Sequence, residues 1–299
     1  MTSSADAGPP AGRFLDTAHG RIFCMHWPAV GDGAVDSGAG SGAAGIGAAL
    51  VVVPPFAEEM NRCRRMWSLL AAQLARDGIA TLIPDLHGTG ESEGDFADAR
   101  WESWRDDVAA ACSFARQQGA RRIALLGVRL GALLALDWLR RAPGNERGDV
   151  TQLILWQPVL DGKQHLNQFL RLKLAAGLRQ TAAAKETTGT LREKVARGER
   201  LEVAGYELTA ELLAAVDALD ARTLAPGAVL RVDWLEVSTS EAPALLPASE
   251  RVLEAWRAGD ARPEPGVVRG EPFWTLQEIT IAPELNTRTR DVAAQALAA

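Results

Sequence analysis

Short apolar runs alternate with longer amphipathic segments along most of this chain. Continuous apolar runs are typical of strands buried on both faces, and they predict strands over residues 49–54, 79–84, 122–126, 152–156, 229–237 and 267–274. Apolar residues at helical spacing predict helices over residues 61–76, 101–118, 130–141, 247–258 and from about 283. Because strands and helices alternate, most of the strands should be parallel and joined by right-handed crossovers.

The N-terminal region departs from this alternation. Residues 13–18 and 21–27 flank a His-Gly turn and predict a β-hairpin. Residues 1–12 are small and polar, and we expect them to be disordered. Residues 31–47 consist mostly of Gly, Ala and Ser, a composition typical of a flexible loop.

The alternation breaks again in residues 160–225. Helical segments at about 163–185 and 208–218 surround a short hairpin that turns near Gly205. We interpret this segment as a helical cap inserted over the carboxyl edge of the sheet, where open α/β sheets hold their active sites. The core then has two parts, residues 13–159 and 226–299.

Composition and charge narrow the class of protein. The net charge of -6 comes from interspersed charges of both signs, without the basic stripe typical of nucleic-acid binding. No apolar run approaches the roughly 20 residues that span a bilayer, and the start has no secretory pattern, so we expect a cytoplasmic protein. The three cysteines are widely spaced and form no CxxC pair. We therefore expect neither a disulfide framework nor a metal or other cofactor.

Three loops that follow predicted strands carry most of the information on the fold. Gly127, Arg129 and Gly131 have the frame of a nucleophile elbow, G-x-S-x-G, in which small flanking residues allow a strained strand-to-helix turn. Arginine replaces the central serine. The loop D-L-H-G-T-G-E-S, residues 85–92, has glycines that permit a tight turn. The loop P-P-F-A-E-E-M-N, residues 54–61, lies where an oxyanion-hole amide is normally supplied.

These loops belong to longer stretches, PPFAEEMNRCRR, LHGTGESEGDF, LGVRLGALLAL, VAGYEL and EPFWTLQEI. Together they resemble the bacterial exosortase A system-associated hydrolase 2 family of the α/β-hydrolase superfamily. The resemblance covers most of the chain. It implies an α/β-hydrolase fold, with an eight-stranded, mostly parallel sheet, helices on both faces and an inserted helical cap. It also implies a link to exosortase-type protein export and exopolysaccharide loci. The word hydrolase in the family name follows the fold, and a fold does not establish chemistry.

The chain lacks two members of the catalytic triad that this fold normally carries. The nucleophile position holds Arg129, whose guanidinium stays protonated and has no free lone pair. The base should be a histidine after the last strand, but the four histidines are residues 19, 26, 87 and 165. The acid position is ambiguous between Glu236 and Glu241, either of which can also be read as a solvated loop carboxylate. We therefore expect no conventional Ser-His-Asp catalysis.

Arg129 should have an anionic partner, because it lies at a helix start, which already carries positive potential. The candidate partners are Glu58 and Glu59 on the facing loop and Glu278 on the segment that replaces the histidine. Two interpretations stay open. Arg129 forms a structural salt bridge and nothing more, or Arg129 and adjacent helix amides bind an anionic ligand such as a carboxylate or phosphate.

Other side chains at the same edge of the sheet are candidates for lining a binding pocket, although core packing explains an aromatic residue equally well. These candidates are Phe56, Trp156, Gln157, Phe273, Trp274 and Gln277. Cys63 and Cys112 fall on predicted helices and should be packing residues. Asp85, His87 and Ser92 share one loop, and three residues of one loop rarely form a triad.

Two classes of function follow from these observations. The first is a catalytically silent α/β-hydrolase-fold protein that binds a small anionic or acyl-containing ligand, or a partner protein, in an exosortase- or exopolysaccharide-linked process. The second is an atypical hydrolase or acyl-transfer enzyme that acts on an ester or thioester with an unrecognised nucleophile. The chemistry of Arg129 favours the first class.

Overall fold

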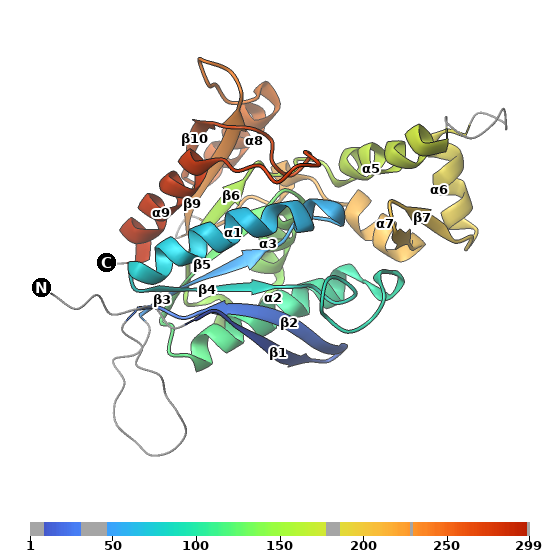
Figure 1. Ribbon diagram of the computed structural model, residues 1–299. Coiled ribbons are helices and arrows are strands. Elements are labelled where there is room, and N and C mark those ends of the chain that lie inside the picture. The colour runs from blue at the N-terminus through green and yellow to red at the C-terminus, as the bar shows by residue number, and fades with distance from the viewer. Residues whose placement is uncertain (1–8, 31–46, 178–185, 228–229, 298–299) are drawn as a thin grey trace, which may run out of the picture.

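An eight-stranded sheet lies at the centre of the computed structural model, which describes residues 9–30, 47–177, 186–227 and 230–297 (Figure 1). In spatial order the strands are β1 (Ala11–Thr17), β2 (Gly20–Trp27), β4 (Ile79–Pro84), β3 (Ala48–Val53), β5 (Arg122–Val128), β6 (Val150–Trp156), β9 (Arg231–Ser238) and β10 (Pro263–Arg269). β1 pairs antiparallel with β2, and β2 with β4. Every other pair of neighbours is parallel. The predicted eight-stranded, mostly parallel sheet is confirmed.

Helices cover both faces of the sheet (Figure 1). One face packs against α1 (Glu58–Arg76) and α9 (Pro283–Leu297), and the other against α2 (Trp101–Gln117), α3 (Leu130–Arg141) and α8 (Pro247–Ala258). Along β3, Leu50 and Val52 point to the α1 side, whereas Val51 and Val53 point to the other. All four side chains are buried. This two-sided burial explains why the strand is a continuous apolar run.

The segment between β6 and β9 contains α5 (Gly162–Gly177), α6 (Thr188–Ala196), the strands β7 (Leu201–Val203) and β8 (Tyr206–Leu208), and α7 (Ala210–Asp217). Figure 1 shows these elements beyond the carboxyl ends of the parallel strands. The ring of Phe169 on α5 packs against Phe56, which follows β3, at a centroid distance of 5.1 Å. The ring of Tyr206 packs against Phe96, in the loop after β4, at 4.9 Å. We call these elements the cap segment; residues 178–185, which the sequence assigns to its first helix, lie outside the described residues.

The last predicted strand is wrong at both ends. The sequence predicts a strand over residues 267–274, whereas β10 covers Pro263–Arg269. β10 is an edge strand, so Pro263 and Pro265 are tolerated there. Its pairing with β9 ends at Arg269 and Ser238, and Phe273 and Trp274 therefore lie in the turn beyond the sheet.

The N-terminal expectations are met in part. The hairpin predicted over residues 13–27 forms as β1 and β2, but β1 begins at Ala11. Disorder through residue 12 is therefore wrong for Ala11 and Gly12, which pair with His26 and Met25. Residues 1–8, and residues 31–46 of the expected flexible loop, lie outside the described residues. Within the described chain, no helix has the length and hydropathy of a membrane span.

Gly131 lets the first turn of α3 pass directly over the end of β3. A Cβ atom on Gly131 would lie 2.2 Å from the carbonyl oxygen of Val53 and 2.4 Å from that of Pro54. Both are backbone atoms, so a methyl group must displace either the strand end or the helix. We expect Gly131→Ala to lower the free energy of unfolding by about 2–3 kcal/mol, measured by urea denaturation.

Gly144→Ala is the matched control, because an added Cβ atom on Gly144 meets no atom within 4 Å. It should change the free energy of unfolding by no more than about 0.5 kcal/mol. Equal effects of the two substitutions would contradict the close approach of α3 to β3.

Candidate functional site

Arg129 lies in the turn between β5 and α3, and its backbone is strained. Its φ of 55° and ψ of -118° are rare for a residue that carries a side chain. The Arg129 N–H donates to the carbonyl of Trp156 at 3.0 Å, and the Arg129 carbonyl accepts from the N–H of Val159 at 3.1 Å. A Cβ atom on Gly127 would lie 2.7 Å from Cα of Ala132. The backbone is therefore that of a nucleophile elbow, with a guanidinium in place of the reactive oxygen.

Two neighbouring loops share this strain. Ala57, directly before α1, has a φ of 53°, and Gln157, directly after β6, has a φ of 41°. Ala57, Arg129 and Gln157 follow β3, β5 and β6, which are neighbours in the sheet. Strained residues other than glycine cluster at functional sites, so these three loops mark the candidate site.

The Arg129 side chain contacts three groups. Its Nε and Nη2 both donate to Oε1 of Glu59, each at 3.3 Å, and its Nη1 donates to the carbonyl of Gln157 at 3.2 Å. The guanidinium also lies over the ring of Trp274, 5.3 Å from the centroid, as in a cation–π contact. The exposed fractions are 16% for the Arg129 side chain and 19% for that of Glu59. Of the carboxylates predicted as partners, Glu59 is the one that pairs with Arg129.

The Arg129–Glu59 contact is not bidentate. Both guanidinium N–H groups share Oε1, while Oε2 of Glu59 is buried with no hydrogen-bond partner in the described structure. Burial raises the pKa of Glu59, and the Arg129 charge opposes that shift. Burial, together with the Glu59 charge, raises the pKa of the Cys63 thiol on the same helix well above its ordinary value. Cys63 is therefore a protonated thiol near neutral pH.

His165 brings a further polar group to the site from the cap segment. The residue is 8% exposed, its ring packs edge-on against Phe56 at 6.0 Å, and its Nε2 has no hydrogen-bond partner among the described residues. Burial lowers the pKa of His165 to about 3, with a contribution from the Arg129 charge. The imidazole is therefore neutral at pH 7.

The sequence prediction did not include His165, because a triad base belongs after the last strand. A signal was nevertheless present. His165 shares the buried face of α5 with Leu166, Phe169 and Leu170, and a histidine on such an apolar face requires an explanation.

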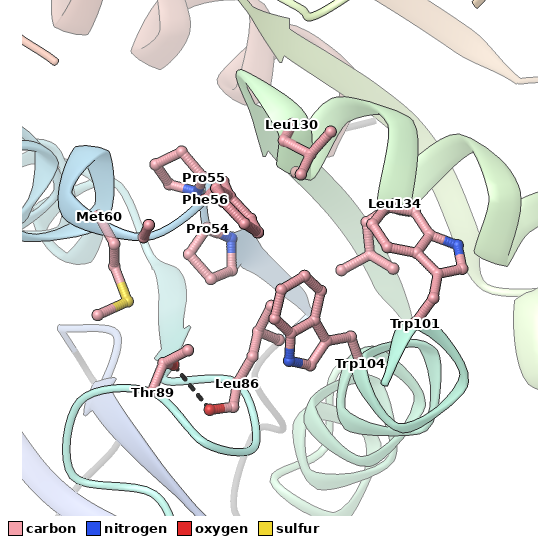
Figure 2. A pocket seen from close by; sticks show the side chains of 12 residues that line it. Pro54, Pro55, Phe56, Met60, Leu86, Thr89, Trp101, Trp104, Leu130 and Leu134 are labelled. Atoms are coloured by element: carbon pink, nitrogen blue, oxygen red, sulfur yellow. Dashed lines mark hydrogen bonds between the residues drawn. The ribbon is translucent and has the colours of Figure 1, made fainter. Parts of the chain in front are cut away.

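Little space remains beside the elbow (Figure 2). The cavity there has a volume of about 10 Å³, enough for roughly one water molecule. Figure 2 shows Trp101 and Trp104 of α2 and Leu134 of α3 facing Phe56 and Met60 across it. This volume is far below that of a small-molecule site, and Arg129, Glu59 and His165 do not line the cavity, so it holds no more than a water molecule beside the elbow.

The residues at the acid and base positions of a triad either have structural partners or are exposed. Glu236 on β9 is buried, and its two oxygens accept from the Trp234 indole N–H and the Leu246 N–H, each at 3.0 Å. It is therefore a structural acceptor rather than a solvated loop carboxylate, whereas Glu241 is exposed. The segment after β10 places Trp274 over Arg129 and leaves Gln277 and Glu278 exposed.

The remaining residues that were predicted to line a pocket lie in different parts of the structure. Glu58 accepts from the Tyr206 hydroxyl at 3.3 Å and belongs to the junction of α1 with the cap segment. Trp156 and Phe273 are buried in the core on the α1 side of the sheet, so core packing explains these two. Phe56 lines the small cavity, and Gln157 and Trp274 contact Arg129.

Asp85, His87 and Ser92 form no triad. Asp85 is ion-paired with Arg64 at 2.9 Å, and the Ser92 hydroxyl donates to the carbonyl of Asp85 at 2.6 Å. Nδ1 of His87 is buried with no hydrogen-bond partner among the described residues. The contacts of Asp85 and Ser92 therefore hold the glycine-rich loop in place.

The elbow and the elements around it match a known family of proteins. The family model described as Serine aminopeptidase, S33 (Hydrolase_4) matches residues 46–210, more than half of the chain. The chain belongs to this family. Its elbow carries arginine where the name Serine aminopeptidase, S33 implies a serine. No curated protein matches the chain.

Several solved structures resemble the chain over nearly its whole length. Est1E from Butyrivibrio proteoclasticus with bound ferulic acid is 14% identical, with 96% of this chain and 100% of that chain covered and a TM-score of 0.61. A proline iminopeptidase-related protein from Thermus thermophilus is 17% identical, with 97% and 99% covered and a TM-score of 0.59. A soluble variant of monoglyceride lipase from Saccharomyces cerevisiae is 10% identical, with 98% and 96% covered and a TM-score of 0.58. At these identities the likeness shows the α/β-hydrolase fold and leaves the chemistry open.

Removal of the Arg129 charge should leave Glu59 as a buried anion without a counterion. We expect Arg129→Met to lower the free energy of unfolding at pH 8 by about 2–3 kcal/mol, less than for a fully buried pair because both side chains are partly exposed. The loss should shrink at pH 5. A carboxyl group whose pKa is raised in the folded state stabilises that state at low pH, and this contribution is lost as the pH rises through the folded pKa. Urea denaturation at the two pH values measures both effects.

The matched control is the double variant Arg129→Met with Glu59→Gln, which removes both charges. It should recover part of the stability lost at pH 8 and show a weaker pH dependence than the single variant. If Arg129→Met were as stable as the parent protein at pH 8, the ion pair would have no structural role.

Proposed function

We propose that this protein is a non-catalytic member of the Serine aminopeptidase, S33 family that binds a small anionic ligand, or an acidic group of a partner protein, at Arg129. One observation carries the proposal. A mostly buried cation stands on the strained elbow and is paired through a single oxygen of Glu59. The elbow position thus serves charge recognition rather than nucleophilic attack.

The groups around the elbow support a non-catalytic role. Acyl transfer requires a nucleophile with a general base within hydrogen-bond reach. Arg129 offers no lone pair, and the Cys63 thiol is kept protonated by burial. Nε2 of His165 has no hydroxyl or thiol partner among the described residues. The alternative, an atypical hydrolase or acyl-transfer enzyme, needs a hydroxyl or thiol paired with a base, and the Thr89 hydroxyl beside the elbow donates instead to the carbonyl of Leu86.

Unused hydrogen-bonding groups support an anionic ligand. An arginine carries five N–H donors, and Glu59 and Gln157 accept from three of those of Arg129. The described structure thus leaves two donors free of protein acceptors. Nε2 of His165 is buried without a partner and calls for an acceptor, whereas the unpartnered Oε2 of Glu59 calls for a proton or a donor. A carboxylate ligand would accept from Arg129, and the neutral imidazole can donate to it.

Glu59 competes with such a ligand for Arg129. Ionised Glu59 occupies the guanidinium and repels an incoming anion, whereas protonated Glu59 does neither. Arg129 and Arg62 are the cations that act on Glu59, and Cys63 and His165 are uncharged near neutral pH. Because burial raises the pKa of Glu59, the competing charge is lost as the pH falls toward that raised pKa.

We therefore expect anions to bind more tightly at pH 5.5 than at pH 8. Acetate, butyrate and inorganic phosphate are the probes, and isothermal titration calorimetry together with the shift in unfolding temperature is the measurement. Glu59→Gln should bind these anions more tightly at pH 8, with a much smaller pH dependence.

Arg129→Met should abolish this binding, whereas Arg269→Gln, at an exposed arginine on β10, should leave it unchanged. If no probe binds the parent protein at pH 5.5, or if binding survives in Arg129→Met, Arg129 is not the anion site.

A second experiment tests for residual catalysis. A fluorophosphonate probe and a panel of p-nitrophenyl esters should give neither labelling nor turnover above the background rate. Stoichiometric labelling of any residue would favour the atypical hydrolase or acyl-transfer enzyme instead.

The sequence resemblance to the exosortase A system-associated hydrolase 2 family extends the proposal to a process. We infer that the ligand or partner belongs to exosortase-linked export or exopolysaccharide formation, with this protein acting on the cytoplasmic side. Cell fractionation tests the location, and recovery of the protein outside the cytoplasm would contradict it.

A further inference from the structure

A second cavity lies at the opposite end of α3 from Arg129. Its volume of about 510 Å³ falls within the range of small-molecule sites. It is open to solvent on one side and is lined by the last turns of α3, by α4 (Gly144–Arg147), by the start of β6 and by residues 225–227 and 230 before β9. The 12 residues of α3 separate it from the elbow by about 18 Å, and it shares no lining residue with the small cavity there.

The wall of this second cavity is mostly aliphatic. Leu136 and Leu139 of α3, Val150 of β6, and Pro226 and Leu230 before β9 line it. An aliphatic wall favours a ligand with an aliphatic body, because contact removes apolar surface of both from water.

Two arginines add positive charge to the same cavity. Nη1 of Arg140 donates to the carbonyl of Thr223 at 3.0 Å, and Nη1 of Arg147 donates to the carbonyl of Leu139 at 2.9 Å. Neither guanidinium forms an ion pair with a carboxylate of the described residues, whereas the adjacent Arg141 pairs with Asp137 at 2.7 Å. Both arginines are exposed, and apart from these two contacts their guanidinium N–H donors have no acceptor among the described residues.

Helix dipoles explain part of this arrangement. Arg140 and Arg147 lie in the last turns of α3 and α4, where positive charge is favourable. The helix dipoles do not explain, however, why both guanidiniums border the same aliphatic cavity. In a chain with a net charge of -6, two arginines without carboxylate partners make this cavity a local anion-attracting site.

We propose that this cavity binds an amphipathic anion, whose aliphatic chain lies against Leu136, Leu139 and Val150 and whose carboxylate or phosphate head contacts Arg140 and Arg147. The site is independent of the anion site proposed at Arg129. It recognises a longer aliphatic chain, which the small cavity beside the elbow has no room to hold.

Decanoate is the probe, and isothermal titration calorimetry at pH 8 is the measurement, since ionised Glu59 then competes for Arg129. Decanoate should bind with a stoichiometry of one. Acetate, which lacks the chain, and decanol, which lacks the charge, should each bind at least about tenfold more weakly, because each loses one of the two recognition elements. Decyl phosphate carries a phosphate in place of the carboxylate and therefore tests the second head group. Binding of either decanoate or decyl phosphate supports the proposal.

The double variant Arg140→Gln, Arg147→Gln should weaken decanoate binding at least about tenfold, because it removes the charge-assisted contacts to the head group. Arg140→Lys with Arg147→Lys keeps both charges and should restore much of the affinity. Arg269→Gln and Arg129→Met should bind decanoate as the parent protein does. An unfolding temperature measured for each variant separates loss of binding from loss of folding.

Three results would overturn the proposal. The first is the absence of binding by both decanoate and decyl phosphate at about 1 mM, the weak end of specific affinities. The second is equal binding of decanol and decanoate, unchanged by the arginine substitutions, which would leave an apolar cavity without charge recognition. The third is loss of decanoate binding in Arg129→Met alone, which would place the ligand at the elbow instead.

Discussion

A guanidinium placed mostly out of water at the positive end of a helix needs a negative charge beside it, and the arrangement around the elbow depends on this requirement. Glu59 meets it from the first turn of α1, which begins where Ala57 adopts a positive φ. The Gln157 carbonyl and the Trp274 ring contribute further negative potential to the same guanidinium. Four segments that are distant in the sequence therefore meet at one charge. That charge also adds to the effect of burial, which lowers the pKa of His165.

The backbone conformation of the elbow does not depend on the side chain at residue 129. Gly127 and Gly131 allow contacts with neighbouring backbone that no other residue fits, and strand pairing on both sides fixes the turn. None of these contacts involves the side chain of residue 129. The backbone of the elbow is thus retained although arginine replaces its central serine, which explains why overall structural likeness does not settle function in this chain.

Much of the fold could be predicted from the sequence, because buried strands and amphipathic helices leave strong periodic signals. The need of Arg129 for an anion followed from charge alone. Charge alone did not identify which carboxylate pairs with Arg129. Glu58 and Glu59 are adjacent, and a helix turns about 100° per residue, so Glu58 contacts Tyr206 and Glu59 contacts Arg129. The sequence did not place Trp274 correctly, because the length of β10 depends on its pairing with β9. It also gave no sign of the second cavity, whose walls come from distant segments.

The two edges of the sheet differ in their capacity to recruit a foreign strand. β10 carries Pro263 and Pro265, which lack the amide hydrogens that a ladder needs, so this border resists strand-by-strand self-association. β1 ends the sheet on the opposite side in the described structure, contains no proline and exposes 55% of Phe14. If copies of this protein aggregate through strand pairing, the pairing should therefore begin at β1. A charged residue or a proline introduced into β1 should reduce this aggregation.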